Sequence, residues 1–307
     1  MNLSSCPLPI GLTTIRDSAF SGCSKLKNID IPKSVSFVGS YAFSTYSGET
    51  ENGITYIDNW AIDFEDSATA TLRDGTVGIA AQAFYDSTEL KSVTIPSSVK
   101  YICNSAFAHS DNLRTVFFEG DSSLECIGDF VFYDCDNLVG IEIPDSVKKI
   151  GEQAFALCYS LNTVSLGNEV LYIGNHAFNS CPLTEITIPD SVKHIGDGAF
   201  ARCTALTEIT IPESVTTLGY FSICSSLKSV VIGKNVSLIE YVTFSDCEAL
   251  EFIFYTGTEA QWEQVYDNSI SIGEERVYYY SAGRPTQIGN YWHYVDGVPT
   301  IWEVSAS

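Results

Sequence analysis

Apolar and polar residues alternate in a short pattern that returns along most of the chain, and residues 183–203 show it clearly. The segment 183–188 reads L-x-x-I-x-I, so its apolar side chains point to one side, which predicts a half-buried strand. Pro189 has no backbone N–H and ends the strand. Asp190 and Ser191 follow and favour a turn. The first half of the unit is therefore one strand and one turn.

The second half of the same unit is also apolar at regular positions. Val192 and Ile195 point inward from a second short extended stretch. Gly196 permits a backbone turn that a side chain would hinder. The Ala-Phe pair that ends at Phe200 fills the interior, and Cys203 closes the unit. Each unit therefore predicts a coil with two extended segments and an aromatic plug.

A phenylalanine at the plug position marks each return of the unit: Phe20, Phe43, Phe84, Phe107, Phe132, Phe155, Phe178, Phe200, Phe221 and Phe244. Their modal spacing of 23 residues lies within the range of leucine-rich repeats, roughly 20–29 residues. One coil cannot bury its own apolar edge, so neighbouring coils must stack into a continuous core. We predict a leucine-rich-repeat solenoid of about ten repeats over residues 1–255, with the Phe and Cys plugs in continuous internal columns.

The longest step between plug residues contains an insertion near residues 47–67. Within it, two alternating stretches flank Asp58 and Asn59, a pair that suits a two-residue hairpin turn. We favour a coil elaborated by this hairpin, with Trp60 and Phe64 packed on the back, because aromatic residues tend to be buried. The alternative is a projecting hairpin that binds a ligand, because insertions in repeat proteins often line one face.

Residues 256–307 abandon the repeat, and twelve aromatic residues fall between Phe252 and Trp302, including the tyrosine run 278–280. We interpret this region as a carboxyl-terminal cap, because the last coil of a solenoid exposes an apolar surface that an atypical unit must cover. The alternative is a glycan-binding module, since flat aromatic rings can stack on sugar faces. Loss of glycan binding on substitution of Trp292 would favour the alternative.

The net negative charge of the chain disfavours two classes of partner, nucleic acids and anionic membranes. The chain has 16 Lys and Arg against 38 Asp and Glu, for a net charge of −22. Nucleic-acid binding needs a basic face that displaces counterions, so we predict no nucleic-acid partner. Anionic membrane surfaces are disfavoured for the same reason, and no segment has the roughly 20 apolar residues of a membrane helix. We therefore predict no membrane insertion.

Cysteine also follows the repeat. Seven cysteines stand three residues after a plug phenylalanine, namely Cys23, Cys135, Cys158, Cys181, Cys203, Cys224 and Cys247. Such a column is a packing position, where a free cysteine acts as a small hydrophobic residue. We expect reduced thiols, because Tyr46, Ser87 and Ser110 interrupt the column. Neither a C-x-x-C pair nor a motif for zinc, phosphate or nucleophilic catalysis occurs. We predict no enzyme, no metal site and no cofactor.

The repeat LxxIxIPxxVxxIGxxAFxxC resembles the BspA-like class of bacterial leucine-rich repeat, over residues 3 to about 255. The stretches YTGTEAQW (255–262) and GNYWHYVDGVPTIW (289–302) resemble the tail that often closes such proteins from gut bacteria. The resemblance implies a right-handed, β-rich superhelix with little helix, a parallel sheet on the concave side and short strands or turns behind. It also implies an exported, surface-associated protein that adheres to host proteins or other cells.

Localisation has little support from the residues themselves. A basic start followed by an apolar run would mark a signal peptide, and neither is visible. The chain begins almost inside a repeat, at SSCPLPIGLTTIRDSAF, so we expect an export signal to lie outside these residues. An extracellular or cell-surface location is therefore an expectation from the resemblance.

The L-x-x-I-x-I strand predicts which residues point outward from the concave sheet. Most are Ser or Thr, whose short side chains suit a tightly spaced parallel ladder, and this purely structural interpretation explains much of the pattern. Exposed apolar residues beside acidic ones instead indicate a protein partner. The candidate partner-binding residues are Asp30, Thr94, Phe117, Glu142, Glu185, Thr187, Glu208, Thr210, Val231, Phe252 and Phe254.

Three functions remain open at this point. The leading hypothesis is a monomeric, non-catalytic module that binds an extracellular protein through the concave face. The second is a module that binds a glycan through the carboxyl-terminal aromatic residues. The third is a passive spacer that displays another domain.

Overall fold

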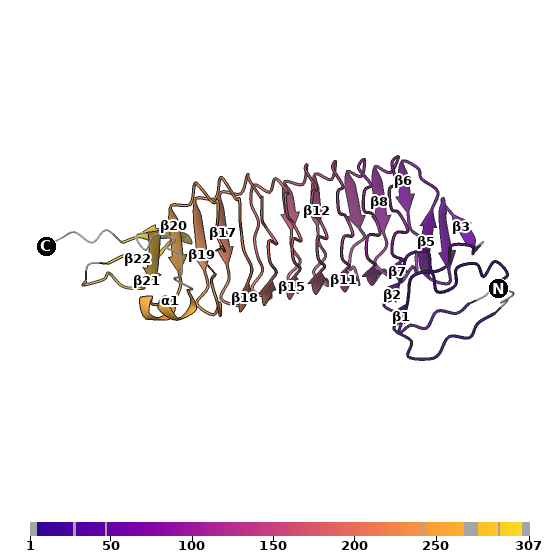
Figure 1. Ribbon diagram of the computed structural model, residues 1–307, viewed down its shortest axis with the longest axis horizontal. Coiled ribbons are helices and arrows are strands. Elements are labelled where there is room, and N and C mark those ends of the chain that lie inside the picture. Colours follow the sequence, from indigo (N-terminus) through magenta and orange to yellow (C-terminus); the bar gives the residue numbers. More distant parts are fainter. Residues whose placement is uncertain are drawn as a thin grey trace.

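The computed structural model describes residues 5–26, 29–46, 48–240, 242–266, 276–287 and 289–302. These residues form an elongated stack of coils with parallel strands along two of its sides (Figure 1). The only helix in these ranges is α1 (Glu259–Val265). The predicted leucine-rich-repeat solenoid, rich in strands and poor in helix, is confirmed.

The front sheet consists of L-x-x-I-x-I strands, and it is interrupted. The segment 183–188, for which the alternation predicts a strand, forms no regular strand and lies in the gap between the second and third parts. The first part is β6 (Thr69–Thr71), β8 (Ser92–Ile95) and β10 (Thr115–Phe118); the second is β12 (Gly140–Glu142) and β14 (Thr163–Ser165); the third begins with β17 (Glu208–Ile211), β19 (Ser229–Ile232) and β20 (Phe252–Tyr255). The step from Phe107 to Phe132 is 25 residues long, and its extra residues fall at Gly120 and Asp121, next to the first gap.

The back sheet is continuous over ten strands. It contains β7 (Gly78–Ile79), β9 (Tyr101–Ile102), β11 (Cys126–Ile127), β13 (Lys149–Ile150), β15 (Tyr172–Ile173), β16 (His194–Ile195) and β18 (Thr217–Leu218), all parallel, and the three strands of the insertion. The short strands expected behind the main sheet therefore form the longer unbroken sheet.

A third side of each coil is built from turns that bond to the next coil. Gln153 and Leu157 have φ of 50° and 63°, in the left-handed region. The N–H groups of Gln153, Phe155 and Leu157 all donate to carbonyl oxygens of the following coil, at 2.8–2.9 Å. Because every second N–H points along the stack, this side satisfies its buried backbone groups without a regular strand.

The plug residues form the predicted internal columns. Neighbouring rings from Phe84 to Phe244 lie 4.7–5.9 Å apart between centroids, and Phe155 and Phe178 are almost parallel, with 2° between their planes. The first two coils form a separate ring pair, Phe20 and Phe43, 5.1 Å apart. Their strands β1 (Thr14–Ile15) and β2 (Phe37–Val38) pair in a sheet of their own, offset from the main stack (Figure 1).

The thiols of the cysteine column make hydrogen bonds as well as packing contacts. The Cys158 thiol donates to the carbonyl oxygen of Phe132, 26 residues earlier, at 3.0 Å. Cysteines at the equivalent positions from Cys135 to Cys247 repeat this bond. Where serine replaces cysteine, the Ser110 hydroxyl donates to the Phe84 carbonyl oxygen at 2.9 Å. Cysteine and serine therefore supply the same donor at this position.

A glycine recurs at one position in most of the coils, with Cys103 in its place in another, and this glycine reflects close contact between coils. A Cβ on Gly151 would lie 2.4 Å from the carbonyl carbon of Gly128 in the preceding coil. Gly196 likewise lies against the preceding coil, where a Cβ would approach Asn175 Oδ1 to 2.5 Å, and its φ is not in the left-handed region. Close approach of two backbones, rather than an unusual turn, explains this glycine.

The insertion forms an antiparallel meander at the amino-terminal end of the back sheet. Its strands are β3 (Glu49–Glu51), β4 (Ile54–Ile57) and β5 (Trp60–Phe64). The turn between β4 and β5 is the expected Asp58-Asn59 pair, whereas the first turn, Asn52-Gly53, is an additional hairpin that this dipeptide favours. Trp60 is buried, and the Phe64 ring packs against Phe84 at 4.7 Å with 35° between the planes, so the hairpin extends the core.

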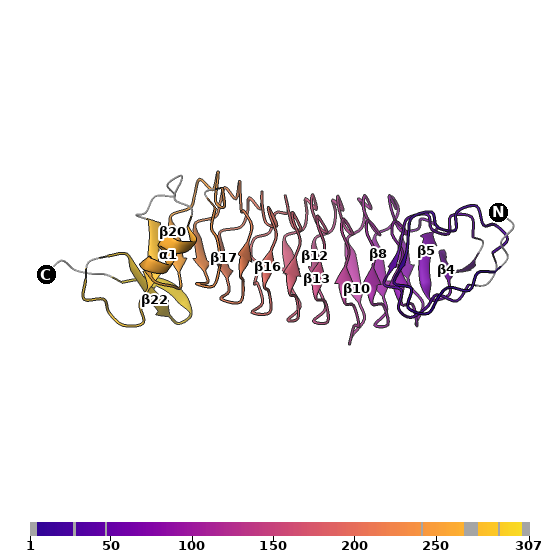
Figure 2. The same ribbon diagram turned by 60° about the horizontal axis from the view of Figure 1, so that its bottom comes forward.

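The carboxyl-terminal region continues the front sheet without completing a coil. Strands β21 (Val277–Tyr280) and β22 (Tyr291–Val295) add to β20 in parallel, and β23 (Val298–Ile301) returns antiparallel to β22. Helix α1 lies at the same end of the stack (Figure 2). Thr258 and Gln261 cap its first turn reciprocally, and Trp262 packs against Tyr255 at 5.2 Å.

Candidate functional site

The front sheet places most of the predicted partner-binding residues on one surface. In the strand register, Thr94 lies beside Phe117. Thr210 lies beside Val231, which in turn lies beside Phe254. These residues occupy the same outward-facing position in successive strands. Side chains that reach solvent are those of Asp30, Thr94, Phe117, Glu142, Glu185, Thr187, Glu208, Thr210 and, partly, Phe252. The front sheet therefore offers an acidic surface with one strongly exposed aromatic ring, Phe117, at 58%.

Two of the predicted residues do not reach solvent. Val231 and Phe254 point outward from the solenoid, as their alternation predicts, yet each is only 5% exposed. The β22–β23 hairpin covers them, and Trp292 packs on Phe254 with 5.3 Å between ring centroids. Their assignment to a free binding surface is therefore wrong, because a segment far along the chain folds over them.

The residues around Phe117 line a groove on the front sheet, which we name the front groove. It lies at the gap between β10 and β12 and has a volume of about 850 Å³. Its floor and walls come from residues 115–122, 140–146, Thr163 and Ser165. Four carboxylates belong to this lining, those of Glu119, Asp121, Glu142 and Asp145. The site therefore combines an exposed ring with negative charge.

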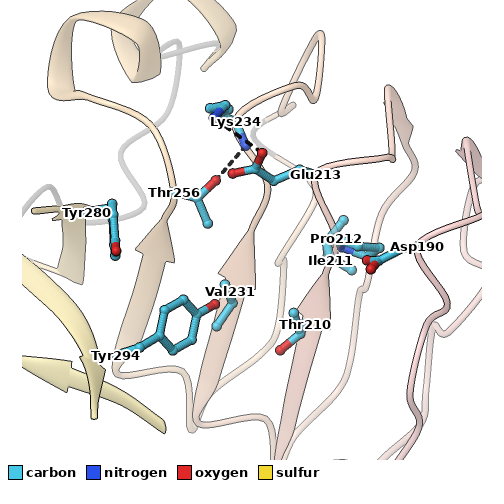
Figure 3. A pocket seen from close by; sticks show the side chains of 10 residues that line it. All are labelled: Asp190, Thr210, Ile211, Pro212, Glu213, Val231, Lys234, Thr256, Tyr280 and Tyr294. Carbon is cyan, nitrogen blue, oxygen red and sulfur yellow. Dashed lines mark hydrogen bonds and ion pairs between the residues drawn. The ribbon is translucent and has the colours of Figure 1, made fainter. Parts of the chain in front are cut away.

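A second groove lies where the carboxyl-terminal hairpin folds over the front sheet, and we name it the cap groove (Figure 3). Its volume is about 390 Å³, and its lining is Asp190, Thr210, Ile211, Pro212, Glu213, Val231, Lys234, Thr256, Tyr280 and Tyr294. The Lys234 ammonium pairs with the Glu213 carboxylate at 3.3 Å, and the Lys234 backbone N–H donates to Thr256 Oγ1 at 2.9 Å. Burial raises the pKa of Tyr294, and nearby Tyr280 and Glu213 raise it further, so its hydroxyl stays protonated at neutral pH.

The aromatic residues of the cap differ in their access to solvent, which the sequence did not reveal. Trp292 is 0% exposed, and its indole N–H donates to the Tyr255 carbonyl oxygen at 3.0 Å. A substitution of Trp292 would therefore test folding rather than ligand contact. Tyr280 and Tyr294, at 40% and 44%, are the rings of the cap groove that a ligand can reach. An Asp296-Gly297 pair between two alternating stretches was the available signal for the hairpin that carries Tyr294.

Within the described ranges, the side chains give little support for metal binding, membrane crossing or thiol reactivity. No group of three or more His, Cys, Asp and Glu side chains there is arranged to hold a metal ion. No helix of the described residues is both long enough and apolar enough to cross a bilayer. All ten cysteines are free thiols, and burial raises the pKa of Cys158 and Cys203 to about 12. These buried thiols are protonated at neutral pH and poorly nucleophilic.

Among solved structures, the chain is similar to bacterial proteins of the leucine-rich repeat class. A leucine-rich repeat protein from Bacteroides ovatus ATCC 8483 has a solved structure with 27% identity and a TM-score of 0.58, covering 91% of this chain and 67% of that one. A leucine rich cell surface protein from Faecalibacterium prausnitzii A2-165 has 22% identity and a TM-score of 0.43, with 87% and 91% covered. The pneumococcal vaccine antigen PcpA has 21% identity and a TM-score of 0.37, with 90% and 83% covered.

Comparison with models of sequence families assigns the chain to a family, which the solved structures alone do not. No protein of curated function matches the chain. The family model described as BspA type Leucine rich repeat region (6 copies) matches residues 1–114 and 125–251. This match covers well over half of the 307 residues, and it includes the same coils whose plug residues form the internal columns. The chain therefore belongs to the BspA type leucine-rich repeat family.

Proposed function

We propose that this protein is an exported, non-catalytic interaction module that binds a protein partner through the front sheet. The observation that carries the proposal is the front groove, where the Phe117 ring is 58% exposed among four carboxylates. The Phe117 ring is among the most exposed large apolar side chains of the described residues, and aromatic residues are enriched where proteins bind one another. The family resemblance supports adhesion at the cell surface as the role of this binding.

The charge of the front sheet favours a basic or mixed-charge partner. Glu142 and Glu208 are exposed on strands of the front sheet, Glu185 is exposed in the gap between β14 and β17, and the net charge of the chain is −22. Opposite charge on a partner would increase the association rate, and this contribution would fall as salt increases. The ring would then contribute a desolvated contact that salt does not weaken.

The test uses biolayer interferometry against purified extracellular matrix and mucosal proteins that span acidic to basic isoelectric points. We expect binding to at least one basic or mixed-charge protein, and Phe117→Ala should weaken it by about tenfold or more, as at interface hot spots. The pair Glu185→Lys with Glu208→Lys should slow association without lowering the melting temperature, because exposed substitutions usually change stability by less than about 0.5 kcal/mol.

Leu171→Ala is the matched control, because Leu171 is an exposed apolar residue, at 45%, that precedes a strand of the back sheet. It should leave binding unchanged. Equal affinity of the parent, the Phe117 variant and the double glutamate variant would place the partner on another surface. Absence of binding to every protein of the panel would contradict the proposal. Surface labelling of intact cells that carry the gene tests export separately.

A further inference from the structure

The cap groove has the composition of a small-ligand site, and its features do not depend on the protein-binding role of the front groove. We propose that it binds a neutral saccharide, with a sugar ring against Tyr294 and Tyr280 and its hydroxyl groups on the polar wall formed by Asp190, Glu213 and Lys234. The volume of about 390 Å³ lies in the range of ligand clefts, about 300–1,000 Å³.

The two tyrosine rings are held in place before any ligand arrives. Both contact the buried ring of Trp292 edge-on, Tyr280 at 5.3 Å and Tyr294 at 4.9 Å, with 69° and 74° between the planes. Tyr280 and Tyr294 also contact each other at 6.3 Å. Because Trp292 is itself anchored to the Tyr255 carbonyl, the rings lose little freedom when a ligand binds, which favours affinity.

The polar wall offers both donors and acceptors, which suits hydroxyl groups. A sugar hydroxyl donates one hydrogen bond and accepts others, as serine and threonine hydroxyls do. The Lys234 ammonium donates, the Glu213 carboxylate 3.3 Å away accepts, and the two side chains are 44% and 51% exposed. Figure 3 shows this pair on one side of the groove and Tyr280 and Tyr294 on the other, with Asp190 at the far end. Adjacent hydroxyls of one sugar ring can therefore meet a donor and an acceptor together.

The charges of the groove favour a neutral ligand over charged ones. An anionic sugar would approach Asp190 and Glu213 within a protein of net charge −22, and like charges repel. A lysine or arginine side chain from a partner would be attracted by Asp190 but repelled by Lys234, which already neutralises Glu213, and the lysine amide probe of the test measures the balance. An uncharged ring with several hydroxyls meets neither penalty.

Saturation-transfer NMR on the whole chain tests the proposal with named probes. These are the methyl glycosides of glucose, galactose, mannose, N-acetylglucosamine and N-acetylgalactosamine, with glucuronic acid and lysine amide as charged comparisons. We expect saturation of at least one neutral glycoside and of neither charged probe. Titration should show that Tyr294→Ala lowers affinity about tenfold or more, whereas Tyr294→Phe, which keeps the ring, retains binding. Asp190→Asn and Glu213→Gln change exposed side chains only, so they test the polar wall even if Tyr294→Ala disturbs the cap.

Tyr85→Ala is the matched control. Tyr85 is 40% exposed, like Tyr280, and also packs edge-on against another ring, that of His109. Its substitution should not change saccharide binding. The proposal is overturned if no neutral glycoside is saturated, if lysine amide or glucuronic acid is preferred, or if neither Tyr294→Ala nor the two carboxylate variants alter binding.

Discussion

The middle coils and the carboxyl-terminal cap both bury aromatic rings, but they do so with different geometry. In the coils each ring stacks on the equivalent ring of the next unit, as Phe155 does on Phe178 at 5.2 Å with 2° between planes. In the cap, Trp292 meets Phe254, Tyr280 and Tyr294 with 49–74° between planes. The coils repeat one environment, whereas the cap forms a single cluster.

This difference in geometry explains why a ligand can reach aromatic rings of the cluster in the cap but not those of the phenylalanine column in the coils. Translation along the stack forces equivalent rings into parallel layers, and such a column leaves no ring free for a ligand. The cap has no repeat to satisfy, so Trp292 can be fully buried while Tyr280 and Tyr294 remain partly exposed. A stack of similar units therefore supplies a rigid scaffold that carries the front groove on its outer surface, whereas the irregular end exposes two rings of its own cluster in the cap groove.

The largest effect is expected from removing one ring in the middle of the column. Phe155→Ala should lower the free energy of unfolding by about 3–5 kcal/mol, and by more if the adjacent coils separate, because Phe155 has a ring above and below it. Phe20→Ala is the comparison, since Phe20 is only partly buried and has one ring neighbour, so it should lose less. Thermal and denaturant unfolding measure both. A Phe155→Ala melt that matches the parent would refute the continuous column.

The second effect should be confined to the cap. Trp292→Ala removes the ring that covers Phe254 and leaves the Tyr255 carbonyl without its indole donor. We expect a cost of about 3–5 kcal/mol that is local, because only the end of the stack packs on this ring. Hydrogen exchange followed by mass spectrometry should show lost protection over residues 252–266, 276–287 and 289–302 and unchanged protection over 84–221. Loss of protection along the whole chain would mean that cap and coils unfold as one unit.

Much of the coil structure could be predicted from the sequence because each position has the same surroundings in every unit. The alternation in L-x-x-I-x-I correctly placed Ile186 inside and Thr187 outside. The plug spacing correctly placed Phe155 and Phe178 in one column. Local pattern is sufficient here because the contacts of a residue repeat with the period.

The candidate sites could be predicted only in part, because they depend on contacts that do not repeat. Alternation directed Val231 and Phe254 outward, yet the hairpin near residue 295 covers both. No local pattern distinguishes the buried Trp292 from the exposed Tyr294, which lie two residues apart on the same face of β22. The front groove depends on a break in the sheet that only the 25-residue spacing hinted at.

The smallest effect tests why cysteine closes each coil. If the column requires only a small apolar residue, Cys158→Ala should be tolerated better than Cys158→Ser. The structure indicates the reverse, because the Cys158 thiol donates to the Phe132 carbonyl and Ser110 makes the same bond. Alanine leaves that buried carbonyl without a partner, at a cost of about 1–3 kcal/mol, whereas serine restores the donor.

Unfolding of the two variants in urea at pH 7 measures this difference. Burial raises the pKa of Cys158 to about 12 from 9.0, so the thiol is a protonated donor at pH 7. Its contribution to stability is complete below about pH 9 and declines as the pH rises toward the folded value. A greater loss for serine than for alanine would show that packing volume, rather than the hydrogen bond, selects cysteine. The cysteine position would then be selected by packing shape, as the phenylalanine column beside it is.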